Sequence, residues 1–186
     1  PGKFDADAHH ALARRAAAQS IVLLKNENSL LPLAKGEKVA VIGDFAQTPR
    51  YQGAGSSSVN ATRVDNLKDA AEADDITLAG FCAGYERSGT PNPAFVEEAA
   101  ALARKADVVV LCMGLDESSE SEGLDRSHIC IPENQKQLLE AVAQANENLV
   151  VVLSAGSVVE TGWVSRCKAV LHAYLGGQAG AGAIMD

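Results

Sequence analysis

Short apolar runs recur along this chain and set its predicted architecture. They occupy residues 38–44, 76–82, 107–113, 149–154 and 168–174. Each run is mostly apolar and lacks a regular alternation of polar residues, a pattern typical of strands that are buried on both faces. The runs therefore predict a sheet of about five strands.

The segments between these runs have the spacing of helices. Apolar positions recur at helical intervals over residues 64–73, 93–105, 133–145 and 158–164, and an Ala-rich stretch over residues 5–26 predicts a long first helix. Strands that alternate with helices indicate a mostly parallel sheet, because a short turn cannot join parallel neighbours. The predicted fold class is α/β, a mostly parallel sheet of about five strands with helices on both faces, as in a flavodoxin-like α/β sandwich.

Composition supports a single domain and argues against some partners. The 186 residues are 47% hydrophobic, which is enough to bury the core of one ordinary domain. The net charge of -8 argues against nucleic acid and anionic membrane surfaces as partners. No apolar run reaches the roughly 20 residues that span a bilayer, and no signal peptide is recognisable. Both ends look cut from a longer polypeptide, so the sequence does not specify the cellular compartment.

The four cysteines indicate buried thiols rather than a metal site. Cys82, Cys112, Cys130 and Cys167 are widely separated, and most lie in apolar runs. No CxxC spacing occurs among them. The sequence therefore predicts free thiols and no metal site.

Two of the loops that follow strands are unusually long. The first covers residues 44–60 and the second covers residues 114–128. Loops of this length in a compact domain are more often functional than idle. Because ligands bind beyond the carboxyl ends of parallel strands, both loops lie where a site is expected.

The second long loop packs five carboxylates and one arginine into eleven residues, 116–126, and three interpretations compete for it. A solvated acidic loop is the simplest, since like charges cost little in water. A divalent-cation site is the second, although the acidic residues do not follow the spacing of an EF-hand. Acid/base chemistry is the third, because crowding by carboxylates or partial burial raises the pKa of a carboxyl group.

The first long loop carries groups that suit a polar ligand. Gly53, Gly55 and Ser56 belong to a Gly-x-Gly-Ser-Ser-Ser run that can present backbone N–H groups and hydroxyls. Both nucleotide fingerprints fail, because the glycines come late after the strand and no Lys-Ser/Thr pair follows. Arg50 and Tyr51 would suit a sugar, one by donating hydrogen bonds and the other by stacking or hydroxyl contact. We therefore take Arg50, Tyr51, Gly55 and Ser56 as candidate substrate-binding residues.

A serine-hydrolase triad finds little support. Gly-x-Ser-x-Gly is absent, and the Ser-Ala-Gly-Ser run at residues 154–157 has its glycine in the wrong place. His9 and His10 fall on the Ala-rich first helix, where a surface role is expected, and His128 and His172 lack a metal-ligand spacing. Satisfied polar contacts are the simpler interpretation of all four histidines.

Two pairs of motifs occur in order along the chain. Residues 11–33 read ALARRAAAQSIVLLKNENSLLPL and lead into KVAVIGD, whereas residues 121–126 read SEGLDR and residues 131–135 read IPENQ. The first pair resembles the α/β-sandwich domain of family 3 glycoside hydrolases, the β-glucosidase and β-xylosidase group. The second pair resembles the EGxDR loop of that family and the LPxNQ start of its next helix. The resemblance covers essentially the whole chain, and the ordered pairing is more specific than any single motif.

The resemblance implies roles for particular residues. In many family members the Glu of the EGxDR loop is the general acid/base, and this role falls here on Glu122. Because its location varies between branches of the family, Glu120 and Glu117 are alternatives. The resemblance also implies that the first long loop lies near the sugar, and that Asp125 and Arg126 shape the acidic loop by a local ion pair.

The resemblance further implies a larger enzyme. The usual member has a (β/α)8 barrel that carries an Asp nucleophile, followed by this sandwich domain, which lends a loop to the active site. We expect residues 1–34 to be a linker and first helix leading in from the barrel, and residues 35–186 to be the α/β-sandwich domain, truncated at its C-terminus. The implied activity is that of a retaining glycosidase acting on terminal β-linked glucose or xylose, without metal or organic cofactor. The isolated fragment is expected to be inactive.

Two functions of other classes fit the same sequence. A non-catalytic flavodoxin-like module would bind a sugar or nucleotide in the two long loops without a barrel. A purely structural accessory domain would tolerate the loss of Glu122. The sequence specifies neither the sugar and its linkage nor the oligomeric state.

Overall fold

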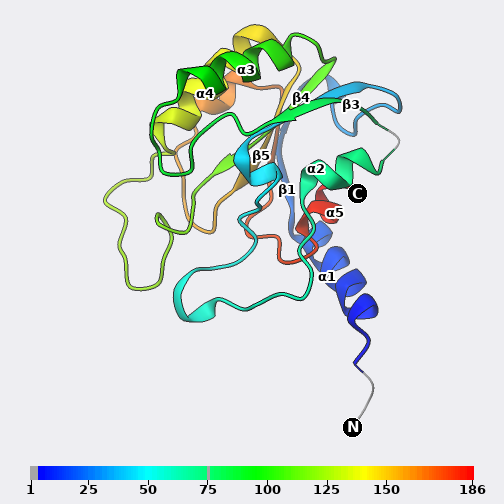
Figure 1. Ribbon diagram of the computed structural model, residues 1–186, viewed down its shortest axis with the longest axis vertical. Coiled ribbons are helices and arrows are strands. Elements are labelled where there is room, and N and C mark those ends of the chain that lie inside the picture. The colour runs from blue at the N-terminus through cyan, green and yellow to red at the C-terminus, as the bar shows by residue number, and fades with distance from the viewer. Residues whose placement is uncertain (1–3, 75) are drawn as a thin grey trace.

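The computed structural model describes residues 4–74 and 76–186, and within them the chain forms one six-stranded sheet with helices on both faces (Figure 1). The strands are β1 (Val22–Asn26), β2 (Lys38–Ile42), β3 (Thr77–Cys82), β4 (Val108–Gly114), β5 (Leu149–Ser154) and β6 (Ala169–His172). The α-helices are α1 (Ala6–Ser20), α2 (Leu67–Glu72), α3 (Pro93–Ala103), α4 (Glu133–Ala145) and α5 (Gly180–Met185). Short 3-10 turns occupy Glu27–Ser29, Asp44–Ala46, Gly55–Ser57 and Gly162–Arg166.

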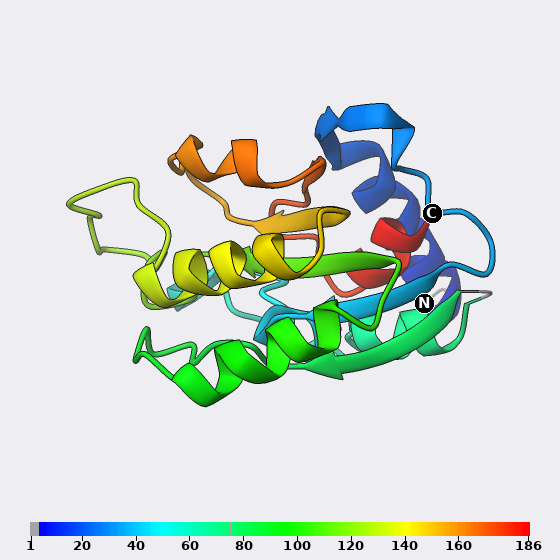
Figure 2. The same ribbon diagram turned by 90° about the horizontal axis from the view of Figure 1, so that it is seen from above.

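The strand order is β1-β6-β5-β4-β2-β3, with β1 antiparallel to β6 and all other neighbours parallel. Parallel neighbours require crossover connections, and these place α3 and α4 on one face of the sheet and α2 and α5 on the other (Figure 2). The predicted α/β class with a mostly parallel sheet is confirmed. None of the helices in the described part of the chain has the length and apolar character of a membrane span.

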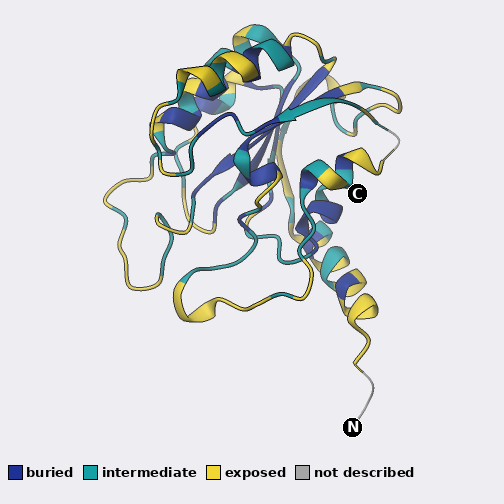
Figure 3. Ribbon diagram, in the orientation of Figure 1, coloured by how far each residue is buried: buried dark blue, intermediate teal, exposed yellow. Residues whose placement is uncertain are grey.

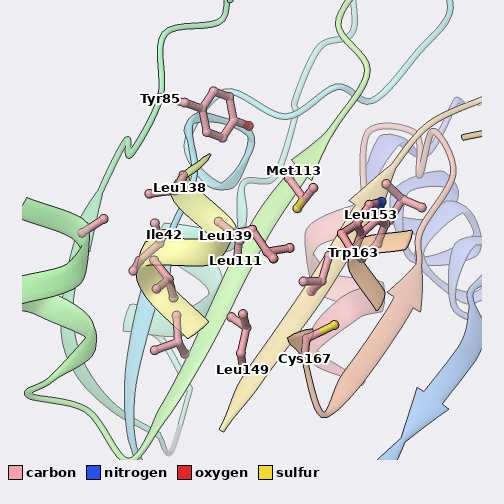
Figure 4. Packing of buried hydrophobic residues seen from close by; sticks show 14 of the residues in the cluster. Ile42, Tyr85, Leu111, Met113, Leu138, Leu139, Leu149, Leu153, Trp163 and Cys167 are labelled. Atoms are coloured by element: carbon pink, nitrogen blue, oxygen red, sulfur yellow. The ribbon is translucent and has the colours of Figure 1, made fainter. Parts of the chain in front are cut away.

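The larger core lies between the sheet and the α3 and α4 face. Leu111 and Met113 of β4 pack with Leu138 and Leu139 of α4, and all four side chains are fully buried (Figure 4). Burial of apolar area is the main stabilising contribution to such a layer. Since this core holds α4 against β4, it also fixes both ends of the acidic loop that connects them.

The second core lies on the α2 and α5 face and is less completely covered. Val39, Val41 and Val110 of the sheet pack with Ala71 of α2 and Ala181 of α5. An apolar groove of about 350 Å³ remains on this face beside α5. The two faces of the sheet are therefore covered unequally in this chain.

A partly buried polar cluster fastens α1 to this face. His10 Nε2 lies 2.7 Å from Asp65 Oδ2, and Gln178 Nε2 lies 2.9 Å from His10 Nδ1. Arg63 donates from Nε to Asp65 Oδ1 at 2.9 Å. Burial alone would raise the pKa of Asp65, but its hydrogen bonds with His10 and Arg63 lower the pKa below its ordinary value. Asp65 is therefore the anion around which α1 docks.

Asp65→Asn is expected to lower the free energy of unfolding by about 1 to 2 kcal/mol, because it removes a charged hydrogen-bond acceptor. Asp65 stabilises the fold above its ordinary pKa of 3.8, and this contribution is lost as pH falls through the lowered folded pKa. Urea unfolding should show a difference in the free energy of unfolding between wild type and Asp65→Asn at neutral pH. This difference should become smaller at acid pH. The control Glu72→Gln removes only an exposed pair with Lys68 and should change stability by less than about 0.5 kcal/mol. Equal losses in the two variants would contradict this role.

Two predicted elements are wrong, for reasons of tertiary pairing. The first helix ends at Ser20 rather than near Asn26, because Ile21 is extended and Val22–Asn26 forms β1. The β1 segment fits helical spacing equally well, and only its pairing with β6 selects a strand. The predicted domain boundary between residues 34 and 35 would therefore assign β1 to the linker, although β1 pairs with β6 of the sheet. Residues 158–164, expected as a helix, contain only the start of the 3-10 turn Gly162–Arg166.

The cysteines behave as apolar core residues. All four are free, and Cys82, Cys112 and Cys167 are buried, whereas Cys130 is partly exposed. Burial raises the pKa of the Cys82 and Cys112 thiols to about 12. The thiolate is thus disfavoured at both positions, and the prediction of buried free thiols is confirmed for these residues.

Candidate functional site

The two long loops leave the same edge of the sheet and are joined to each other. The first follows β2 and the second follows β4, and these strands are parallel neighbours. Both loops extend from the same end of the sheet and are largely exposed (Figure 3). An isolated parallel bridge pairs Ala54 of the first loop with Ser121 of the second. The sequence placed the loops at one edge, and the structure adds that they touch.

Glu122 follows this bridge directly and is held through one carboxylate oxygen. Ser56 donates to Glu122 Oε2 twice, from its backbone N–H at 2.9 Å and from its hydroxyl in a short contact. No hydrogen bond to Oε1 occurs within the described residues. The Ser56 hydroxyl and then the Ser56 N–H lower the pKa of Glu122, because both stabilise the ionised carboxylate. In this chain Glu122 is therefore an exposed carboxylate with one free oxygen.

Gly55 allows the two loops to approach this closely. Its φ of 85° lies in the left-handed region that glycine tolerates. A Cβ at this position would lie 2.8 Å from the Glu122 Cβ. Gly55 and Ser56, which the sequence predicts to lie near a sugar, contact the candidate acid/base Glu122.

The two alternative carboxylates have other partners. Glu120 accepts hydrogen bonds from the Gly156 N–H at 2.9 Å and from the Ser157 hydroxyl at 2.5 Å, so both of its oxygens are engaged. Glu117 lies 3.4 Å from Arg87 Nη1, in an ion pair. The other Glu117 oxygen, Oε1, lies 3.9 Å from Arg50 Nε, so among these three glutamates of the described chain Glu122 is the one with an oxygen that has neither a hydrogen bond nor an ion pair.

Arg50, a candidate substrate-binding residue, is buried in this chain. Its side chain has 0% exposure, and it packs beneath the acidic loop. Nη2 donates to the Glu120 carbonyl at 3.2 Å, while Nε is 3.9 Å from Glu117 Oε1. Two of its nitrogens, Nε and Nη1, are buried without a hydrogen bond. Arg50 therefore supports the acidic loop from below, because a buried cation favours the carboxylates and carbonyls above it.

Tyr51 makes hydrogen bonds with Gln52 and with the segment that leads into α5. Its hydroxyl accepts a hydrogen bond from Gln52 Nε2 at 2.8 Å, and its carbonyl accepts one from the Gly177 N–H at 2.9 Å. It lines a small cavity of about 40 Å³ together with residues of α5. That Arg50 and Tyr51 bind a sugar stays a prediction.

Asp125 and Arg126 do not form the predicted local ion pair within the described residues. Arg126 Nη1 instead donates to the Ser157 hydroxyl at 2.8 Å and to the Val158 carbonyl at 2.9 Å. Asp125 is exposed. Arg126 thus ties the acidic loop to the segment that follows β5, and the charge on Asp125 plays no part in this contact.

An open hollow of about 690 Å³ lies beside the acidic loop. Its lining combines the polar side chains of Glu120, Arg126 and His128 with the apolar Leu124 and Ile129. Such a mixed, open surface suits contact with a polar ligand or with another domain better than enclosure of an apolar molecule. Nowhere in 4–74 or 76–186 do three metal-ligating side chains come together.

Three residues of the site were not identified from the sequence. Arg87, in the loop after β3, forms an ion pair with Asp44 at the start of the first long loop. Gln135 accepts a hydrogen bond from the Gly114 N–H at 2.8 Å, where the acidic loop begins, and Asn134 donates to the Glu86 carbonyl at 2.8 Å. The IPENQ motif signalled the last two as a helix start, but nothing in the sequence indicated their contacts.

Comparison with known proteins agrees with this geometry. Residues 21–186 match the family model described as "Glycosyl hydrolase family 3 C-terminal domain". Thermostable beta-glucosidase B of Acetivibrio thermocellus is 49% identical over 99% of this chain and 25% of its own length. An exo-alpha-(1->6)-L-arabinopyranosidase of Bifidobacterium breve is 44% identical, again over 99% of this chain and 26% of its own length.

Solved structures show the same relationship. The Bifidobacterium adolescentis GH3 beta-glucosidase superposes with a TM-score of 0.91 and 45% identity, over 99% of this chain and 27% of that one. The beta-glucosidase of Listeria innocua in complex with isofagomine superposes with a TM-score of 0.85 and 25% identity, over 97% of this chain and 25% of that one. The chain thus spans about a quarter of the length of these relatives. The resemblance seen in the motifs is confirmed, and the chain belongs to glycosyl hydrolase family 3 as a C-terminal domain of that family.

Proposed function

We propose that this domain supplies Glu122 as the general acid/base of a retaining glycosidase that removes terminal β-linked glucose or xylose from oligosaccharides or glycosides. One observation carries the assignment. Glu122 is the carboxylate of the acidic loop with one oxygen held by Ser56 and the other without a recorded partner in the described residues. A group that exchanges protons with substrate and water needs one such accessible oxygen. The names of the relatives, β-glucosidases and β-xylosidases among them, support this substrate class.

A second carboxyl group must come from outside this chain. Retaining glycosidases place an acid/base and a nucleophile about 5 Å apart on the two sides of the scissile bond. Two other carboxylates of the loop are engaged elsewhere, Glu117 with Arg87 and Glu120 with Gly156 and Ser157. In line with the family resemblance, we propose that residues 1–34 lead in from a (β/α)8 barrel of the same polypeptide, which carries the nucleophile. Because β1 of this segment belongs to the sheet, residues 35–186 form the rest of the α/β-sandwich domain.

The proposed reaction is a double displacement that consumes one water. In the first step the nucleophile forms an ester with the anomeric carbon, the glycosidic C–O bond breaks, and the Glu122 proton moves to the leaving oxygen. In the second step water adds to the anomeric carbon, its proton moves to Glu122, and the ester bond breaks. Glu122 regains its proton and the nucleophile regains its charge, so the cycle closes without metal or organic cofactor.

The first step requires a protonated Glu122, although Ser56 favours the carboxylate. A second negative carboxylate about 5 Å away disfavours ionisation of Glu122, and exclusion of water by a docked barrel acts in the same direction. We expect the pKa of Glu122 to be higher in the assembled enzyme than in this chain alone. The acid form is therefore a property of the two domains together.

Chemical rescue tests the assignment in the full-length enzyme. Glu122→Gln should be nearly inactive on an aryl β-glucoside, and added azide should restore turnover and give a β-glycosyl azide. Azide needs no general base, so it replaces the water that Glu122 would have activated. Failure of azide to restore turnover would contradict the assignment.

The pure chain, without a barrel, should hydrolyse no aryl β-glucoside above the rate in buffer. It contributes the acid/base but no nucleophile, and the two must act at the same anomeric carbon. Release of a chromogenic aglycone, measured beside the full-length enzyme at equal molar concentration, checks this. Measurable turnover by the pure chain would contradict the proposal that the nucleophile comes from a separate barrel domain.

A further inference from the structure

We propose that Ser56 is a positioning residue for the acid/base, holding Glu122 through Oε2 so that only Oε1 exchanges protons during catalysis. The inference rests on the proposed function of Glu122 and adds a residue from the other long loop. Its basis is the pair of hydrogen bonds from the Ser56 N–H and hydroxyl to the same carboxylate oxygen.

Two donors on one oxygen restrict the carboxylate more than one donor would. A single hydrogen bond leaves an exposed glutamate free to swing about it, whereas two donors from one residue fix both the position of Oε2 and the plane of the group. The ordering of a catalytic group before substrate arrives removes part of the entropic cost of the reaction. Oε1 has no hydrogen bond within the described residues and stays available for proton transfer.

The segment that carries Ser56 is itself braced. Gln52 clamps the base of the loop, since its side chain donates to the Val59 carbonyl at 3.1 Å and accepts from the Val59 N–H at 3.0 Å. The 3-10 turn Gly55–Ser57 holds Ser56 between the bridge at Ala54 and this clamp. Ser56 therefore lies in a turn whose two ends are held by hydrogen bonds.

The chemistry of the two steps explains why such a residue is useful. Glu122 must give up a proton in the first step and accept one in the second. A strong preference for either the protonated or the ionised carboxyl group would therefore slow one of the two steps. The barrel nucleophile favours the protonated form, and the Ser56 donors favour the ionised form. Ser56 thus offsets the effect of the nucleophile on the protonation of Glu122.

The experiment compares Ser56→Ala with wild type in the full-length enzyme, on aryl β-glucosides with good and poor leaving groups. Loss of the hydroxyl removes a donor to the carboxylate, so the alkaline limb of the kcat/KM profile should move to higher pH. For the poor leaving group, kcat/KM at the optimum should fall about five- to ten-fold, as expected for loss of one positioning hydrogen bond. For the good leaving group, which needs little proton donation, the loss should be smaller.

Two further variants separate positioning from a structural role. Ser56→Thr keeps the hydroxyl and should restore the wild-type profile. Ser58→Ala is the matched control, because Ser58 lies in the same exposed loop and its hydroxyl has no recorded partner in the described residues. An unchanged alkaline limb in Ser56→Ala, or an equal loss for both leaving groups, would overturn the inference.

The double variant Ser56→Ala/Glu122→Gln distinguishes this inference from the function on which it rests. If Ser56 acts through Glu122, the double variant should be no slower than Glu122→Gln alone. Azide rescue of Glu122→Gln together with a normal Ser56→Ala profile would overturn the inference and leave the proposed function standing. No azide rescue of Glu122→Gln would overturn both.

Discussion

Glu122→Gln in the full-length enzyme is expected to lower kcat/KM about 10²- to 10⁴-fold for a β-glucoside with a poor leaving group. Glutamine keeps the size of the side chain and can still accept the two Ser56 hydrogen bonds, but it cannot donate a proton to the leaving oxygen. For an activated leaving group the first step should proceed, and the glycosyl-enzyme ester should accumulate because no base activates water. A burst of aglycone followed by slow turnover measures this.

The neighbouring carboxylates provide matched controls. Glu120→Gln removes a charge that is already committed to Gly156 and Ser157, and Glu117→Gln removes a partner of Arg87. Both should keep the leaving-group dependence of wild type and show no azide product, even if the loop loses some order. If Glu122→Gln behaved like wild type, while Glu120→Gln or Glu117→Gln were inactive and rescued by azide, the acid/base would be the residue whose variant azide rescues.

Gly114→Ala is expected to destabilise the domain by about 3 to 5 kcal/mol, the largest stability effect that we anticipate for a single added methyl group. Gly114 has a φ of 147° and ends β4, where it pairs with Ser154 of β5. A Cβ here would lie 1.9 Å from the Ser154 carbonyl oxygen, a backbone atom that cannot move without separating the two strands. The Gly114 N–H also donates to Gln135, so α4 would shift as well. Thermal unfolding and soluble yield of the full-length enzyme measure the loss.

Gly123→Ala is the control for backbone strain. Gly123 also has a positive φ, of 79°, but a Cβ at this position would meet nothing within 4 Å. It should cost only about 1 kcal/mol, the strain of a left-handed conformation for alanine. If Gly114→Ala were no less stable than Gly123→Ala, close packing of β4 against β5 would not explain the need for glycine at residue 114.

The buried parts of the fold were predictable because their pattern and their environment agree. The bounds expected for residues 149–154 and 133–145 match β5 and α4. The β5 run is apolar from Leu149 to Leu153 because both faces of the sheet are covered. The β1 segment was misassigned because it is an edge strand with exposed leucines, so its sequence carries no signal of burial on two faces. Local spacing cannot distinguish such a strand from a helix.

The site was predictable only in part. The rule that loops after parallel strands gather at one edge placed residues 44–60 and 114–128 together, and the EGxDR resemblance indicated Glu122. Contact between Ser56 and Glu122, 66 residues apart, depends on the closeness allowed by Gly55. The burial of Arg50 depends on the acidic loop folding over it. A side chain that looks suited to a sugar in sequence can therefore be enclosed by its own domain.

The sequence by itself determined the α/β class, the family and the loop that carries the candidate acid/base, because apolar periodicity and short motifs are local properties of the chain. Only the tertiary structure decided that Glu122 is held through one oxygen while the other stays free, which arginine is buried and which serine holds Glu122. These depend on pairing between distant segments, and the energy of such contacts is set by distance and burial in the folded chain.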